Sequence, residues 1–203
     1  MKKAIIFLLC MTCLYMLVPM TALAVEFQLQ KQNIVRLHVV GASDDAEDQA
    51  VKLLVRDAMI GYLEPEIAKC SNSEEVKAYL TENLPAIESA ANDFLAEVGN
   101  KDRATVTLCK EAFPIRSYDT FTLPSGVYSS LRITIGEGEG KNWWCVVFPS
   151  FCIQATSEGF LDTAAGAGFS QPLGETLCGK DTHTISFFFL DCIGKIENFF
   201  HFR

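Results

Sequence analysis

The chain lacks the residue clusters that metal sites and nucleic-acid surfaces require. Its 203 residues include only three histidines, His38, His183 and His201, and none stands in an H-x-x-x-H or H-E-x-x-H arrangement. Lysine and arginine do not cluster, and the formal net charge is −8. Since a phosphate-binding surface needs clustered positive charge, we expect no nucleic-acid partner. We also expect no metal and no cofactor.

Recognisable catalytic motifs are missing as well. The turn Gly136–Lys141 is one residue short of a P-loop, and a strand follows it where a helix would supply the phosphate-binding amides. There is no G-x-S-x-G motif, and Asp162-Thr163-Ala164 lacks the glycine and the second copy of an aspartic protease. We therefore expect no enzyme. The alternative that the residues leave open is a secreted hydrolase with Cys145 or Cys152 as nucleophile, paired with His38.

One long hydrophobic run is present, and it lies at the N-terminus. Lys2 and Lys3 precede an apolar run from Ala4 to Met20, and Ala22-Leu23-Ala24 supplies small residues at its end. This order is typical of a secretory signal peptide, so we expect residues 1–24 to be removed after Ala24. The alternative is an uncleaved anchor, because a run of about 17 residues is at the lower limit for a membrane span. Both interpretations place the rest of the chain outside the cytoplasm.

Export changes the interpretation of the cysteines. Two of the eight lie within the signal segment, and six remain: Cys70, Cys109, Cys145, Cys152, Cys178 and Cys192. An even number in an exported protein permits disulfides. Cys145 and Cys152 flank Pro149, where a chain reversal would bring them into bonding range. These two are the candidate disulfide; the alternative is that they pack as small apolar residues with free thiols.

The pattern of apolar residues predicts an α+β core over residues 33–152, after a polar lead-in at 25–32. Residues 33–40 alternate as a strand does, and three helices are expected next, at 45–62, from Ser71 to about Leu80, and from Pro85 to Val98. Strands are then expected at 104–109, 127–135 and 143–148, with short alternation between 113 and 123. This order predicts a mostly antiparallel sheet of about four to five strands packed against three helices.

The remaining residues, 153–203, divide into two parts. Residues 153–180 are rich in glycine, serine and threonine, and the stretch GAGFSQPLGET at 166–176 is expected to form a loop. Apolar residues then fall at helical spacing from about 184 to 200, which predicts an amphipathic helix that packs on the core. The alternative is that this helix presents its apolar face to a membrane or to a partner helix.

The strand at 143–148 is the best candidate for a partner surface. Trp143 and Trp144 are consecutive, so they point to opposite faces of the sheet, and only one of them can enter the core. A tryptophan left facing outward is suited to an interface. The alternative is that helices or the C-terminal segment cover both faces of the strand. The candidate surface therefore consists of Trp143, Trp144 and Phe148, together with Glu137 and Glu139 of the preceding turn.

Three stretches of the chain resemble the stage II sporulation protein R family. They read VRLHVVGASDDAEDQAVKLLVRDAM at 35–59, ENLPAIE at 82–88 and FPIRSYDTFTLPSGVYSSLRITIGEGEGKNWWCVVFPSFC at 113–152. The resemblance spans residues 33 to 152, and beyond Cys152 it is poor. The family's loop commonly reads A-N-S-D, whereas this chain has Gly41-Ala42-Ser43-Asp44.

The resemblance implies a signalling role without catalysis. The resemblance implies that this chain, like the proteins of that family, is made in the forespore and exported into the space between forespore and mother cell. There they activate a membrane-embedded aspartic protease of the mother cell, which then processes pro-sigma E. If this chain behaves in the same way, replacing Trp143 or Trp144 by alanine is expected to abolish signalling.

Overall fold

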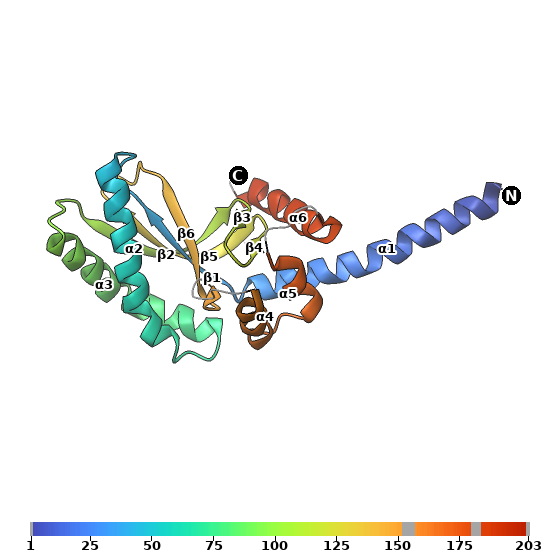
Figure 1. Cartoon of the computed structure of the whole chain (residues 1–203), viewed down its shortest axis with the longest axis horizontal. Coiled ribbons are helices and arrows are strands. Elements are labelled where there is room, and N and C mark those ends of the chain that lie inside the picture. The colour runs from blue at the N-terminus through green and yellow to red at the C-terminus, as the bar shows by residue number, and fades with distance from the viewer. Residues whose placement is uncertain (1, 152–156, 180–183, 202–203) are drawn as a thin grey trace. The chain divides into compact units, whose positions relative to one another are not determined.

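The computed structural model describes residues 2–151, 157–179 and 184–201. The chain divides into two compact units (Figure 1). The sheet unit comprises Gln32–Glu111 and Tyr128–Gln154, and the terminal unit comprises Met1–Lys31, Ala112–Val127 and Ala155–Arg203.

The sheet unit is built on a four-stranded sheet of order β2-β5-β1-β6. Its strands are β1 (Val35–Val40), β2 (Ala104–Phe113), β5 (Gly126–Ile135) and β6 (Asn142–Phe148); residues 112–113 of β2 and 126–127 of β5 are assigned to the terminal unit. The expectation of a mostly antiparallel sheet was wrong in detail, because the sheet is mixed. β1 is antiparallel to β6 but parallel to β5. Parallel neighbours need a long crossover connection, and here the chain passes through two helices and β2 before β5 lies beside β1.

Two helices, and not the three expected, connect β1 to β2. They are α2 (Ala46–Ile67) and α3 (Ser73–Glu97), and each contains a proline in its interior, Pro65 and Pro85. An interior proline costs a helix about 3 kcal/mol. In α3 the segments before and after Pro85 both bury apolar side chains in one core, Leu80 on one side and Ile87 on the other. That burial offsets the cost of the proline, and the helix continues.

The N-cap of α3 is Asn72, one residue after Ser71, where this helix was expected to open. The Asn72 side chain accepts a hydrogen bond from the Glu75 amide at 3.0 Å, and Glu75 Oε2 accepts one from the Ser71 amide at 2.7 Å. This reciprocal arrangement satisfies two amide groups at the helix start that have no partner within the helix.

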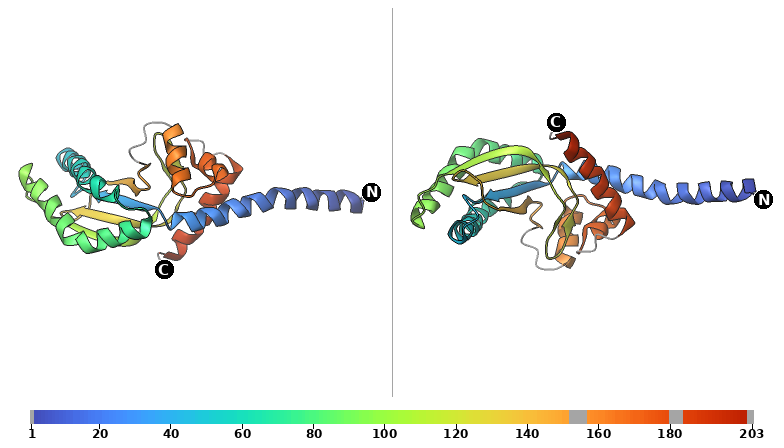
Figure 2. Two further views of the ribbon diagram at one scale, coloured as in Figure 1. Left: turned by 90° about the horizontal axis from the view of Figure 1, so that it is seen from below. Right: turned by 90° about the horizontal axis from the view of Figure 1, so that it is seen from above.

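The core of the sheet unit lies between the helices and one face of the sheet (Figure 2). Alternate residues of β1 and β5 supply it, among them Leu37 and Leu131, and Met59 of α2 packs against them. Each fully buried side chain of this size contributes about 1.5–3 kcal/mol. The intervening residues, such as His38 and Arg132, project to the opposite face. That second face carries the polar residues described below.

The terminal unit is mainly helical. Its elements are α1 (Lys2–Lys31), β3 (Arg116–Ser117), β4 (Thr122–Leu123), α4 (Ser157–Gly166), α5 (Gln171–Leu177) and α6 (Ile185–His201). The helix expected at 184–200 is confirmed as α6. The residues expected to be a lead-in continue α1, in which Phe27 is fully buried. Within the described residues, no helix is long and apolar enough to span a membrane.

The expectation of a loop over residues 166–176 was wrong for most of this segment. Gly166 ends α4, residues 171–176 lie in α5, and residues 167–170 connect the two helices. Phe160 of α4 and Leu173 of α5 are fully buried. Ser170 caps α5 by accepting a hydrogen bond from the Leu173 amide. Gly174 allows close packing, because a Cβ at this position would lie 3.3 Å from Leu161 Cδ2. Small residues here serve helix packing and not chain flexibility.

Candidate functional site

The glycine-rich turn after β5 is joined to the loop after β1. The amides of Glu139, Gly140 and Lys141 donate to Ala42 O at 3.1 Å, Gly41 O at 2.9 Å and Asp44 Oδ1 at 2.8 Å. A phosphate-binding loop needs amides that are free to bind the ligand. These three consecutive amides already bind the chain itself, so the turn is a structural connection and not a nucleotide site.

A buried lysine strengthens this connection. Lys52 of α2 donates from Nζ to Lys141 O at 3.0 Å and to Gln49 Oε1 at 2.6 Å. Burial lowers the pKa of Lys52, although the nearby Asp44 carboxylate opposes the effect. The lysine therefore ties the first turns of α2 to the turn before β6. Sequence reasoning did not identify Lys52, because the spacing of residues along a helix does not reveal a carbonyl group 89 residues away.

The two tryptophans lie on opposite faces of the sheet, as the alternation of strand residues predicts. Trp143 packs against the core on the helix side, where the Arg56 guanidinium lies 5.0 Å from the centre of its ring. Trp144 lies on the other face, with its ring centroid 5.6 Å from that of His38. Phe148 packs against the core, while Glu137 and Glu139 are exposed on the turn. Of the five candidate residues, Trp144 is the aromatic one on the polar face.

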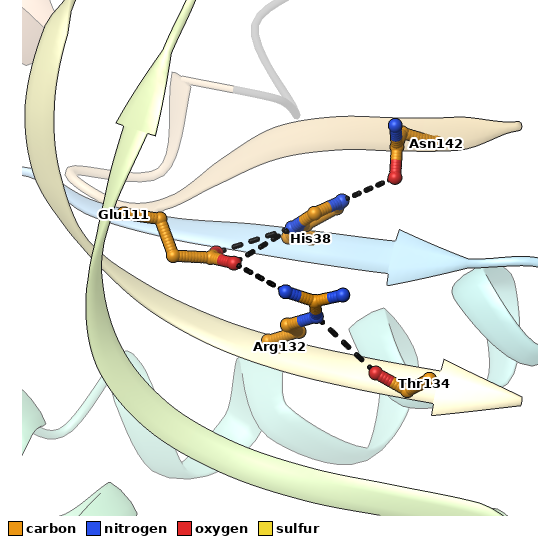
Figure 3. A network of polar contacts seen from close by, with 5 residues as sticks. All are labelled: His38, Glu111, Arg132, Thr134 and Asn142. Atoms are coloured by element: carbon orange, nitrogen blue, oxygen red, sulfur yellow. Dashed lines mark hydrogen bonds and ion pairs between the residues drawn. The ribbon is translucent and has the colours of Figure 1, made fainter. Parts of the chain in front are cut away.

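A network of polar side chains crosses the sheet (Figure 3). One member, His38, lies beside Trp144. His38 Nδ1 lies 3.1 Å from Glu111 Oε2, and His38 Nε2 lies 2.8 Å from Asn142 Oδ1. Arg132 donates to Glu111 Oε1 at 3.1 Å and to Thr134 Oγ1 at 3.2 Å. β1, β2, β5 and β6 each contribute at least one member. We call these five residues the sheet network.

Glu111 is the electrostatic centre of the sheet network. Burial alone would raise its pKa, but the hydrogen bond with His38 and the positive charge of Arg132 outweigh burial and hold the pKa below its ordinary value. The carboxylate is therefore ionised at neutral pH and fixes the two side chains beside it. The side chain of Arg132 remains 40% exposed. The face thus combines a half-buried tryptophan with an accessible guanidinium, two groups that are common at protein interfaces.

The same geometry rules out a catalytic pair of Cys145 and His38. Cys145 stands opposite Leu37 in the β1–β6 register and lies in the core, whereas His38 stands opposite Trp144. Neighbouring strand residues project to opposite faces, so the sulfur and the imidazole lie on different sides of the sheet. Cys145 is moreover disulfide-bonded. A disulfide sulfur is not a nucleophilic thiolate.

The cysteines are only partly paired in the described residues. Cys152 lies outside these residues, so its pairing with Cys145 stays a prediction. Cys70, Cys109, Cys178 and Cys192 are not in disulfides. Burial raises the pKa of Cys70 and of Cys109, which makes these two thiols poor nucleophiles at neutral pH.

The sheet network was largely missed by sequence reasoning. His38 was singled out as a lone histidine, but Glu111, Arg132 and Asn142 were not connected with it. The available signal was the alternation of polar residues at 132 and 134 with the buried Leu131, Ile133 and Ile135. That alternation predicts a polar face on the strand at 127–135, but it does not reveal which other strands contribute residues to the same face.

The fold and the site define an α+β protein with a polar, partly exposed face on a mixed sheet, and the described residues contain no cluster suited to a metal ion. The family model for stage II sporulation protein R matches residues 31–158. Stage II sporulation protein R of Bacillus subtilis (strain 168) is 30% identical over 198 residues, covering 91% of this chain and 83% of that relative. The chain therefore belongs to the stage II sporulation protein R family, which confirms the resemblance. No solved structure matches the chain.

Proposed function

We propose that this protein is an exported sporulation signal that activates a membrane-embedded aspartic protease of the mother cell. Activation leads to the processing of pro-sigma E. In this proposal the chain is made in the forespore and secreted into the space between forespore and mother cell. Membership of the family supports the role in sporulation. The apolar N-terminal run that ends in Ala22-Leu23-Ala24 supports export.

The sheet network with Trp144 is the observation that favours recognition of a protein partner. Its hydrogen bonds and ion pairs hold His38 and Arg132 in place, so little side-chain freedom is lost when a partner binds. Trp144 adds apolar area beside an accessible cation. All these residues lie within the segment that matches the family model, 31–158. We therefore assign the contact with the protease to this face of the sheet.

The alternative of a secreted hydrolase has less support. It requires a thiolate at Cys145 or Cys152, together with a base. Cys145 is buried, disulfide-bonded and on the face opposite His38. Signalling by binding needs neither a thiolate nor a base.

Reconstitution in a non-sporulating bacterium tests the proposal. The protease and its pro-sigma substrate are expressed with or without this full-length chain, and the substrate is followed by immunoblot. Cleavage only in the presence of the chain supports the activator role. Failure to cleave, with the protein exported and folded and the protease taken from the same organism, would overturn it.

Matched variants then test the assigned face. Trp144→Ala is expected to abolish cleavage while the protein is still exported. Leu54→Ala is the control, because Leu54 is an apolar side chain of α2 that is 48% exposed; it should leave cleavage unchanged. Equal activity of Trp144→Ala and Leu54→Ala would show that the partner binds elsewhere.

A further inference from the structure

The last turns of α1 pack into the terminal unit, whereas the rest of this helix is exposed. Between Lys2 and Pro19, every side chain whose position the structure describes is exposed. Ala24 is 4% exposed, Phe27 is fully buried and Lys31 is 4% exposed. These three residues recur at helical spacing and share one face of α1. The change from exposed to buried side chains therefore falls at Ala22-Leu23-Ala24, where cleavage is expected.

Polar contacts on both sides of the buried phenylalanine hold this part of α1 in place. Glu26 accepts hydrogen bonds from the Ser170 amide at 2.7 Å and from Ser170 Oγ at 2.8 Å. Gln30 donates from Nε2 to Gly168 O at 2.8 Å. Both partners belong to the terminal unit. Residues 25–31, which remain after cleavage at Ala24, are therefore a structural part of that unit.

A buried charge holds the end of the same helix. Lys31 forms an ion pair with Glu197 of α6, and the lysine side chain is 5% exposed. A lysine is seldom buried to this degree unless its ammonium group is paired. Undocking of α1 would separate this pair and expose Phe27 to water, so the docked state of the helix is favoured.

The bond expected to be cleaved lies inside this docked helix. Ala24 and Val25 are both helical. Val25 itself is exposed, so the bond is protected by its helical conformation and by the contacts of Ala24, Glu26 and Phe27 beside it. Peptidases cut a folded chain where it opens locally, and the rate falls with the population of the open form. Opening here requires that α1 leave its contacts with the unit.

We propose that the Ala24–Val25 bond is cleaved only before the terminal unit folds. Folding docks α1 and protects the bond, so cleavage and folding compete for the newly exported chain. A chain that is cleaved first folds with residues 25–31 as its first helix, and a chain that folds first keeps the whole of α1. A cleaved signal and an uncleaved anchor are then two products of one sequence. The inference rests on the export signal of the proposed function, but not on activation of a protease.

Cleavage of the purified full-length chain by a bacterial signal peptidase tests the proposal. The folded chain is kept in mild detergent with the peptidase, and its N-terminus is followed by mass spectrometry. A peptide of residues 1–31 is the reference, because it carries the bond without the unit that protects it. We expect the folded chain to be cut at least about tenfold more slowly than the peptide. Equal rates would overturn the proposal, as would an uncut peptide, since the bond would then be no processing site.

Ser170→Ala weakens the docking without changing the sequence that the peptidase reads. The variant loses the hydroxyl that donates to Glu26, so the folded chain should be cut about tenfold faster than the parent. Thr176→Ala is the matched control, because it removes an exposed hydroxyl of α5 that bonds only within the helix, to Pro172 O. It should be cut at the rate of the parent. Equal rates for Ser170→Ala and Thr176→Ala would contradict the proposed protection by docking.

Phe27→Ala removes the buried side chain of the docked helix and should be cut nearly as fast as the peptide. Leu29→Ala is its control on α1, because Leu29 is 63% exposed, and it should behave as the parent does. If Phe27→Ala were cut as slowly as the parent while the peptide was cut rapidly, docking would not be what protects the bond, and the proposal would be wrong. Neither the membrane protease nor its pro-sigma substrate enters this assay, so its failure would leave the activator role untouched.

Discussion

Replacing Gly140 by alanine should separate the two joined loops of the sheet unit. A Cβ at Gly140 would lie 2.2 Å from Ser43 O, 2.7 Å from Ser43 C and 2.8 Å from Gly41 O. All three neighbours are backbone atoms, so no side chain can rotate away. The turn must move, and its hydrogen bonds from Glu139, Gly140 and Lys141 to the facing loop are weakened or lost.

The size of the effect follows from these hydrogen bonds. Each contributes about 0.5–1.5 kcal/mol, and the bond to the Asp44 carboxylate somewhat more, so we expect a loss of about 2–4 kcal/mol in the free energy of unfolding. For a chain of this length that corresponds to a fall in Tm of roughly 5–15 °C. Urea unfolding followed by circular dichroism measures the change.

Gly61→Ala is the matched control for the same substitution. Gly61 lies inside α2, and a Cβ there meets nothing within 4 Å. Alanine favours a helix over glycine by about 1 kcal/mol, so this variant should be more stable than the parent. The two glycine-to-alanine changes are thus expected to have opposite signs. Equal unfolding midpoints for Gly140→Ala and the parent would refute the steric reasoning.

Three further predictions concern the tryptophans, the sheet network and acid stability. Trp143→Ala should lower the free energy of unfolding by about 3 kcal/mol, because Trp143 packs on the core. Trp144→Ala should lower it less but should abolish substrate cleavage. Equal losses of unfolding free energy for the two variants, measured by urea unfolding, would contradict this division. Glu111→Gln should cost about 1–3 kcal/mol, since a charged partner is lost from buried hydrogen bonds, and an unchanged midpoint would show that the network is not stabilising. For Asp191, burial alone would raise the pKa, but hydrogen bonds from Lys195 and Ser125 outweigh it, and the pKa is lowered on folding. The contribution of Asp191 to the free energy of unfolding is therefore full above the ordinary aspartate pKa of about 3.9, and it is lost as the pH falls through the lowered folded value. Asp191→Asn should flatten that acidic part of the stability–pH curve. A curve as steep as the parent's would refute the assignment.

The alternation of apolar residues was sufficient to predict the core-facing side of the strands. In the strand expected at 127–135, alternation places Leu131, Ile133 and Ile135 on one side, and all three are buried. Strand order was not predictable in the same way, because alternation does not state which strands are neighbours. The parallel pairing of β1 with β5 depends on a crossover that local patterns do not record.

Proline and glycine misled the prediction of helices for a common physical reason. Pro85 and the glycines of 166–176 disfavour helices locally, yet burial of Ile87 and Leu173 stabilises the helices in which they lie. Tertiary packing overrides local propensity when enough apolar area is buried. The sheet network also depends on tertiary structure. Side chains that contact each other across strands of the network are 21 to 104 residues apart in the sequence, so local patterns do not reveal these contacts.

The joined loops also limit how the chain can vary in length. Turns at a protein surface usually tolerate inserted residues, because nothing fixes their path. Here three successive amides at 139–141 bind the facing loop, so an inserted residue would break this sequence of bonds. Among relatives, the number of residues between β5 and β6 should therefore stay constant, while the exposed side chains at Glu137 and Glu139 can change.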